Sequence, residues 1–367
     1  MRIGIILHGP EIVDEGGAKR IIEILRTEHD IIAKLGGTMG RTAVLDAGLE
    51  DIIDISEGMT PSQTINALKG RIDLAVLLNH GKTPDTGEQF GCIVASRLDL
   101  SMPFIHIERP DGEGRIIYYD NRSKRCAEYI RKVLMKHGNY NIPIEKHSPL
   151  PLNVEHEGDR VIRRVLGALP GENIRVDGIV IGHVTSAQPE IVCVDGRVSE
   201  LRGGMIKQHG LEKLNNRNID LFTAKVKTGN IRRSKHEPRI KTVKSHPAGV
   251  AIIDHCAEST FDLVKDAGMV ITVGDDTTAI AADILARLGI PIIGITDGDL
   301  DCILEDTTVA EGSVIIRVRE GFDDIVGKEV FEKIFKREAQ IQIQEKSNLL
   351  ARIIGLAKKN IIEIKYY

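Results

Sequence analysis

Residues 269–296, MVITVGDDTTAIAADILARLGIPIIGIT, have the pattern of a strand, a helix and a second strand. The apolar runs 269–273 and 290–296 have the length of buried strands. One face of the helix between them carries Ile280, Ala281, Ile284, Leu285 and Leu288. Two neighbouring strands joined by a single helix run parallel, so this stretch predicts a βαβ unit and an α/β fold.

Each strand of this unit is followed by acidic residues. Asp275 and Asp276 follow the first strand, and Asp297 and Asp299 follow the second. The carboxyl ends of parallel strands lie on one edge of a sheet, with neighbouring strands about 5 Å apart. Crowded carboxylates repel one another unless a cation is present, and their oxygens suit Mg²⁺ that is shared with a substrate phosphate. The pattern therefore predicts a Mg²⁺ site at these four aspartates, with Asp297 and Asp299 also acting as catalytic residues.

A simpler interpretation of the same acids stays open. Asp276, followed by two threonines, is a good helix N-cap, and negative charge is favoured at this end of a helix. Asp-Gly-Asp at 297–299 is also common in turns. Gly274 and Gly294 favour a backbone that a ligand approaches closely, and Gly274 and Thr277 are predicted to contact a cofactor.

Residues 1–140 alternate between apolar strands and amphipathic helices. The predicted strands are 2–7, 30–37, 50–55, 73–81 and 103–108, and the predicted helices are 16–29, 41–49, 60–70, 88–98 and 122–138. Continuous apolar strands of this kind indicate a parallel sheet that helices cover on both faces.

Three glycine-containing loops follow strands of this first domain, at 8–17, 36–43 and 79–91. The second loop, GGTMGRTA, combines glycine amides, hydroxyls and an arginine beside a helix, and such groups can hold a phosphate. It matches neither GxxxxGK[ST] nor GxGxxG, so no named nucleotide motif applies. The residues predicted to bind a phosphorylated or nucleotide-like cofactor are Gly36, Gly37, Thr38, Gly40, Arg41 and Thr42.

Histidines stand at the ends of several predicted strands. His8 and His80 each precede a glycine, and His106 lies close in sequence to Glu108 and Arg109. A single histidine at a strand end is more often a packing or turn residue. Several at one sheet edge favour acid–base chemistry, because histidine changes its charge near neutral pH. His8 and His80 are therefore predicted to be catalytic.

The rest of the chain divides into three further segments. A group of prolines between 143 and 151 ends the first domain, and residues 150–245 are predicted to be β-rich, with a hairpin turn at Asp195-Gly196. An α/β lobe is expected at 246–336 and a terminal helix in 337–367. The expected fold class is α/β, with two Rossmann-like parallel-sheet lobes and a β-rich middle segment that ends in a basic linker.

Composition limits the class of protein. The 367 residues are 42% apolar and 28% charged with a net charge of −4, which indicates a packed globular protein that is not a polyanion binder as a whole. No apolar run approaches the roughly 20 residues of a membrane helix, and no signal peptide is recognised, so a cytoplasmic protein is expected. The absence of Trp and the abundance of Ile, Glu, Lys and Arg are typical of a thermophile. Five scattered cysteines predict neither a disulfide framework nor a zinc site.

Five motifs carry a resemblance to a known family. They are HGPEIVDEG, LGGTMGRTAVLDAGLE, NHGKTPDTGEQFG, HIERPDGEGRIIYYD and TVGDDTTAIAADILARLGIPIIGITDGDLD. Together they resemble an uncharacterised family of methanogenic archaea, domain of unknown function 2117. The resemblance implies a cytosolic protein of such an organism, and it supplies no reaction and no catalytic residue.

A second, weaker similarity concerns the Toprim domain of topoisomerases and primases, in which an acid follows one strand and Asp-x-Asp follows another. Asp297 and Asp299 match the second element. The first is normally glutamate, whereas this chain has Asp275 or Asp276, and only one helix separates the two elements.

Three functions are compatible with these patterns. The first is binding of a phosphorylated or nucleotide-like small molecule with Mg²⁺, with phosphoryl or nucleotidyl transfer as the expected reaction. The second is a non-enzymatic ligand-binding or assembly factor for methanogenesis proteins. The third is nucleic-acid processing, which is less favoured because the basic stretch 225–244 has no aromatic residue for base stacking. A homo-oligomer is compatible with all three.

Overall fold

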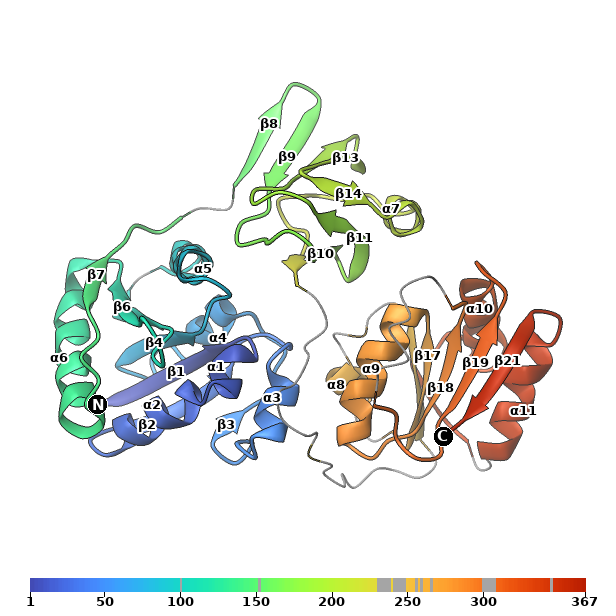
Figure 1. Cartoon of the computed structure of the whole chain (residues 1–367), viewed down its shortest axis with the longest axis horizontal. Coiled ribbons are helices and arrows are strands. Elements are labelled where there is room, and N and C mark those ends of the chain that lie inside the picture. Colours follow the sequence, from blue (N-terminus) through green and yellow to red (C-terminus); the bar gives the residue numbers. More distant parts are fainter. Residues whose placement is uncertain are drawn as a thin grey trace. The chain divides into compact units, whose positions relative to one another are not determined.

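The computed structural model folds into two compact units, residues 1–237 and 238–367 (Figure 1). The residues that the structure describes are 1–99, 101–150, 153–229, 239, 249–254, 257, 260–264, 267–298, 308–343 and 346–367. The first unit contains a large mixed sheet and two smaller antiparallel sheets, and the second contains one mixed sheet. Each unit is described by itself.

The N-terminal sheet has seven strands, whose order reverses once. Its strands are β1 Arg2–His8, β2 Asp30–Leu35, β3 Ile53–Asp54, β4 Leu74–Asn79, β5 Phe104–Glu108, β6 Arg115–Tyr118 and β7 Ile144–Lys146. Their order is β3-β2-β1-β4-β5-β6-β7, and β1 to β5 are parallel, while β6 is antiparallel to β5. The chain grows outward from β1 in one direction and then from β4 in the other. The reversal therefore lies between β1 and β4.

Helices cover both faces of this sheet (Figure 1). They are α1 Glu11–Asp14, α2 Gly17–Arg26, α3 Arg41–Asp46, α4 Pro61–Ala67, α5 Pro84–Ser96 and α6 Asn121–Gly138. Alternate strand residues point to opposite faces, so Ile5 packs with α2 and α6, while Ile6 packs with α4 and α5. Burial of apolar side chains on both faces explains the unbroken apolar strands of the sequence.

The middle part of the first unit is β-rich. Its elements are β8 Val154–Glu157, β9 Arg160–Arg164, β10 Asn173–Val176, β11 Ile179–Val184, β12 Glu190–Val194, β13 Arg197–Arg202, β14 Gly204–Ile206, α7 Gln208–Asn215 and β15 Val226–Thr228. They form two four-stranded sheets, ordered β14-β11-β10-β15 and β13-β12-β9-β8, around one apolar core. The predicted hairpin at Asp195-Gly196 is confirmed, since Val194 pairs with Arg197 and both turn residues have positive φ, 49° and 71°.

The second unit is built on six strands. They are β16 Gly249–Asp254, β17 Met269–Val273, β18 Ile292–Thr296, β19 Val314–Val318, β20 Gln340–Gln342 and β21 Ile361–Tyr366, and the helices are α8 Thr260–Leu263, α9 Asp275–Arg287, α10 Asp323–Lys333 and α11 Lys346–Ala357. The order is β20-β16-β17-β18-β19-β21, with β16 to β19 parallel and both outer strands antiparallel to them. Apolar residues of α9 pack on one face of the sheet, and those of α10 and α11 pack on the other.

The expected α/β fold class is confirmed, including the βαβ unit β17-α9-β18. The two outer strands β20 and β21 were not predicted. Helix α5 also begins at Pro84, four residues before the predicted start, because Thr83 forms a capping box with Thr86. Within the described part of the chain, no helix is long and apolar enough to cross a membrane.

The packing of α9 predicts a stability effect. Leu285 is fully buried against the second unit's sheet, so Leu285→Ala should lower the free energy of unfolding of this unit by about 2–5 kcal/mol through lost contacts and a cavity. Urea unfolding followed by circular dichroism measures this loss. Ile325→Ala on α10 is the control, because Ile325 is 51% exposed and its loss should change stability by no more than about 0.5 kcal/mol. Equal effects of the two changes would contradict the packing.

Candidate functional site

A buried polar network lies at the carboxyl edge of the N-terminal sheet, where the strand order reverses. His8 ends β1, Asn79 ends β4 and Glu108 ends β5. His8 Nδ1 lies 3.0 Å from Asn79 Oδ1, and Asn79 Nδ2 donates to Glu108 Oε2 at 2.7 Å. His106, two residues before Glu108 on β5, places Nε2 3.0 Å from the same carboxylate oxygen. Three adjacent strands thus contribute side chains to one continuous series of hydrogen bonds.

The carboxylate of Glu108 is the centre of this network. It is fully buried, and it accepts hydrogen bonds from Asn79, from His106 and, at 2.6 Å, from the backbone N–H of Gly81. Burial by itself would raise the pKa of Glu108, but the hydrogen bond and charge of His106, with the bonds from Gly81 and Asn79, hold that pKa below its ordinary value. Glu108 is therefore ionised at neutral pH.

An ionised Glu108 fixes the orientation of every neighbour. Because a carboxylate only accepts hydrogen bonds, the Asn79 NH₂ must face it, and the Asn79 carbonyl must face His8. Nδ1 of His8 is then the donor, which leaves the lone pair of His8 on Nε2. Burial lowers the pKa of His8 to about 4, so the ring is neutral at pH 7. His8 is stacked on Phe90, with ring centroids 3.7 Å apart.

Glycines of α5 allow the helix to lie directly on this network. A Cβ added to Gly87 would overlap the Glu108 carboxylate, and one added to Gly91 would overlap the His106 ring. The two glycines are one helical turn apart, so they form a bare strip on a single face of α5. Burial of the network thus depends on the absence of side chains at these two positions.

Arg109 follows Glu108 in a strained conformation. Its φ is 46°, which is unusual for a residue with a side chain. Its backbone N–H donates to Asn79 O at 2.8 Å, and its guanidinium donates to Gly81 O at 2.5 Å. Within the described residues Arg109 has no carboxylate partner, so this sheet edge carries a half-buried positive charge close to the network.

The loop after β2, predicted to hold a phosphate, is largely engaged with the protein. The N–H of Gly36 donates to Leu7 O, and that of Gly37 donates to Met59 O. The side chain of Arg41 is fully buried, Thr42 is buried, and a Cβ on Gly40 would lie 2.8 Å from Gly9 O. Among the described residues, the buried hydroxyl of Thr38 has no hydrogen-bond partner. Binding of a phosphate by this loop stays a prediction, and a ligand would reach Arg41 only after a rearrangement.

The acidic strand ends of the second unit do come together. Asp275 Oδ1 accepts the N–H of Gly298 at 3.4 Å, and Asp297 Oδ2 accepts the N–H of Gly321 at 2.8 Å. These bonds link the loops after β17, β18 and β19. Asp275 and Asp276 also lie in the first turn of α9, after Gly274 at the N-cap. The prediction that Asp276 is the N-cap is therefore wrong, because Gly274 takes that position and no described side chain caps this end of α9. The two carboxylates lie in the first helical turn, where negative charge is favoured.

The structure describes only three of the four aspartates predicted to bind Mg²⁺. Asp299 lies outside the described residues. Among those that are described, no group of three or more His, Cys, Asp or Glu side chains is arranged to hold a metal ion. Thr277 is buried near the start of α9. Magnesium binding at Asp275, Asp276, Asp297 and Asp299 stays a prediction.

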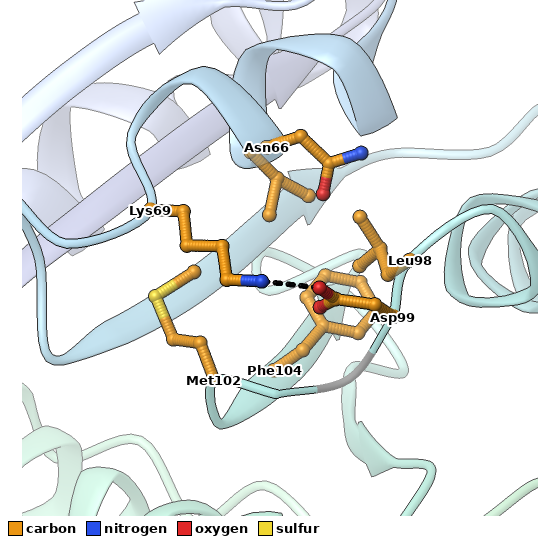
Figure 2. Close-up of a pocket in the computed structure, with 7 residues that line it drawn as sticks. Asn66, Lys69, Leu98, Asp99, Met102 and Phe104 are labelled. Carbon is orange, nitrogen blue, oxygen red and sulfur yellow. Dashed lines mark hydrogen bonds and ion pairs between the residues drawn. The ribbon is translucent and has the colours of Figure 1, made fainter.

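A small surface pocket lies elsewhere on the N-terminal sheet. Figure 2 shows Lys69 and Asp99 paired across it, above Phe104 at the start of β5. Phe104 stands at the amino end of its strand, whereas Glu108 stands at the carboxyl end. The pocket is therefore separate from the network.

Comparisons with known proteins show to which family the chain belongs. Residues 5–338 match the family described as "Uncharacterized protein conserved in archaea (DUF2117)". The chain belongs to this family. An uncharacterized protein of Methanocaldococcus jannaschii is 44% identical to it over 336 residues, 91% of each chain. This relative of the DUF2117 chain comes from a methanogen, and its name assigns no activity.

One solved structure was also matched, the crystal structure of Aa-Ago with externally bound siRNA. The TM-score is 0.19 at 12% identity, over 88% of this chain and 36% of the other. A similarity this low carries no argument about the fold or function of the DUF2117 chain.

Sequence reasoning found part of this site. His8 was predicted as a functional residue and belongs to the network, and His80 is the next residue after Asn79, half-buried in the loop. Distances between side chains cannot be read from a sequence, so Asn79 and Glu108 were missed as partners of His8. Their position at strand ends next to His80 and Arg109 was the available signal.

The network predicts the protonation of His8. In histidine-labelled protein, nitrogen-detected NMR should show a neutral His8 ring with its proton on Nδ1 down to about pH 4, with the signal assigned by its loss in His8→Gln. The unfolded chain protonates His8 near pH 6.5, so its contribution to stability is present above that pH. It is lost progressively, by up to about 3 kcal/mol, as the pH falls toward 4. Protonation of His8 near pH 6.5 in the folded protein would refute the arrangement.

Proposed function

We propose that the N-terminal sheet binds a phosphorylated or nucleotide-like small molecule at its carboxyl edge, between the ends of β1 and β4. The observation that carries the proposal is the reversal of strand order at that point, with His8 and Asn79 on its two sides. Open α/β sheets bind ligands outside the carboxyl ends of the strands at such a reversal, since the loops there diverge and leave a crevice.

The groups at this edge suit such a ligand. His8 offers an unprotonated Nε2, which can accept a hydrogen bond from a sugar hydroxyl or an amine, and Phe90 supports its ring. Arg109 offers a positive charge that can face a phosphate, and its strained backbone is of the kind found at binding sites. Lys82 lies in the loop between β4 and α5, and its Nζ forms an ion pair with Oε1 of Glu172 in the β-rich middle part at 2.5 Å.

The N-terminus of α2 is a less suitable phosphate site in this chain. Phosphates often bind at the N-terminus of a helix, where backbone N–H groups are free. At α2 the carboxylate of Asp111 packs against Gly17 and pairs with Arg20, so the protein's own anion occupies that end. Burial raises the pKa of Asp111. The ligand's phosphate is therefore expected at Arg109.

The proposal is tested by ligand binding to the full chain. Isothermal titration with a panel of nucleotides and phosphorylated sugars should find a ligand whose affinity falls at least tenfold in Arg109→Gln, because a charge-assisted contact contributes about 1.5–3 kcal/mol. His8→Gln should weaken the same ligand. The matched control is His183→Gln, which changes an exposed histidine on β11. Binding that is equal in all four proteins, or absent from wild type, would count against this site.

Magnesium-dependent phosphoryl or nucleotidyl transfer is the reaction that we propose if the chain is an enzyme. The contact between the Gly298 amide and Asp275 favours it, because it brings the ends of β17 and β18 to one edge. In this case Mg²⁺ should bind wild type in calorimetry and bind Asp297→Asn at least tenfold more weakly, since one of the carboxylate ligands is lost. Glu320→Gln, an exposed acid in the loop after β19, should bind as wild type does. No heat from Mg²⁺ with wild type would leave the aspartates with their contacts to the loop amides alone.

A further inference from the structure

The outer strand β21 of the second unit has an exposed apolar edge. It is the last strand in its sheet and pairs with β19 on one side, and no described strand pairs with its other side (Figure 1). Ile362 is 58% exposed, Tyr366 66% and Tyr367 41%. Ile362 and Tyr366 belong to β21, and Tyr367 follows it directly.

Proteins normally protect such an edge from pairing with other strands. Proteins shorten their edge strands, place lysines or prolines on them, or cover them, because the unpaired N–H and C=O groups bind other strands. β21 has a bulge, since the register with β19 shifts between Arg317 and Val318 and leaves Ile362 as the extra residue. From Glu363 to Tyr366 the strand is regular and exposes its outer backbone groups. Two protective devices are therefore present, the bulge and Lys365, beside a regular segment with exposed apolar side chains.

The sequence of β21 is complementary to itself. Two copies that run antiparallel about an axis at Ile364 place Glu363 of each strand opposite Lys365 of the other. The same register places Ile362 opposite Tyr366. Both pairs occur twice, one on each side of the axis, so every exposed apolar residue of the segment meets another and every charge meets its opposite.

The charges of β21 are available for such pairing. In the residues that the structure describes, neither Glu363 nor Lys365 forms an ion pair, and Nζ of Lys365 lies 5.0 Å from the centroid of the Tyr367 ring. Glu363 and Lys365 are two residues apart and share a face of the strand. Opposite charges directly across an antiparallel pair are attractive, and like charges there are repulsive.

We propose that β21 pairs with β21 of a second copy of this chain, in an antiparallel arrangement about Ile364 that joins two six-stranded sheets into one. The symmetry is a closed two-fold, in which the same surface of each copy meets itself. The paired segment is short, so the contact belongs to the small and weak class of interfaces, with dissociation at micromolar concentration or above.

Charge reversal tests the register. Sedimentation velocity over micromolar to millimolar protein should show a concentration-dependent dimer for wild type. Glu363→Lys places lysine opposite lysine, and Lys365→Glu places glutamate opposite glutamate, so each variant alone should dimerise about tenfold more weakly. A mixture of the two variants should recover wild-type association, because in the mixed dimer every pair is again of opposite charge. The double variant should recover it as well.

Matched controls separate this pairing from a general charge effect. Glu338→Lys and Lys328→Glu change the same charges at exposed positions outside β21 and should dimerise as wild type does. Circular dichroism of each variant checks that the second unit is folded. A wild type that stays monomeric at millimolar concentration would overturn the proposal. So would reversal variants that associate as strongly as wild type, or a mixture that fails to recover.

Discussion

One buried negative charge, the carboxylate of Glu108, determines the polar structure of the N-terminal sheet. An ionised carboxylate without partners in an apolar interior is very costly, so the fold must bring donors to it. Asn79 of β4, His106 of β5 and the Gly81 amide meet this requirement, and each bond constrains the element that supplies it. The same charge sets the tautomer of His8 on a third strand, so the His8 ring is oriented by a residue that it does not touch.

The sequence predicted most of the fold because both sheets depend on signals that are local. Apolar runs predicted the strands, and helical spacing predicted the helices. Asp195-Gly196 predicted a hairpin, because such a turn requires residues that can adopt positive φ. The outer strands β20 and β21 escaped prediction for a physical reason. Two thirds of the residues of each strand are exposed, so they lack the unbroken apolar run that marks a strand buried on both faces.

The candidate site was harder to predict because it is made by long-range contacts. Asn79 and Glu108 are 29 residues apart and His8 and Asn79 are 71 apart, and no spacing rule connects them. The aspartates of the second unit illustrate the opposite problem. Their convergence at one sheet edge followed from the βαβ pattern, but a helix cap, a loop contact and a metal ligand all use the same residue type. The sequence predicts the position of Asp275 at the strand end but does not predict which group its carboxylate contacts.

The bare strip on α5 has a cost and an evolutionary consequence. Glycine inside a helix loses roughly 1 kcal/mol relative to alanine, so Gly87 and Gly91 weaken a helix whose stability then rests on its caps and its neighbours. A methyl group at position 87 could be accommodated only if residue 108 became shorter, and one at position 91 only if residues 106 and 119 both became smaller. Across related chains we therefore expect a side chain at either glycine only together with smaller residues at the positions it contacts.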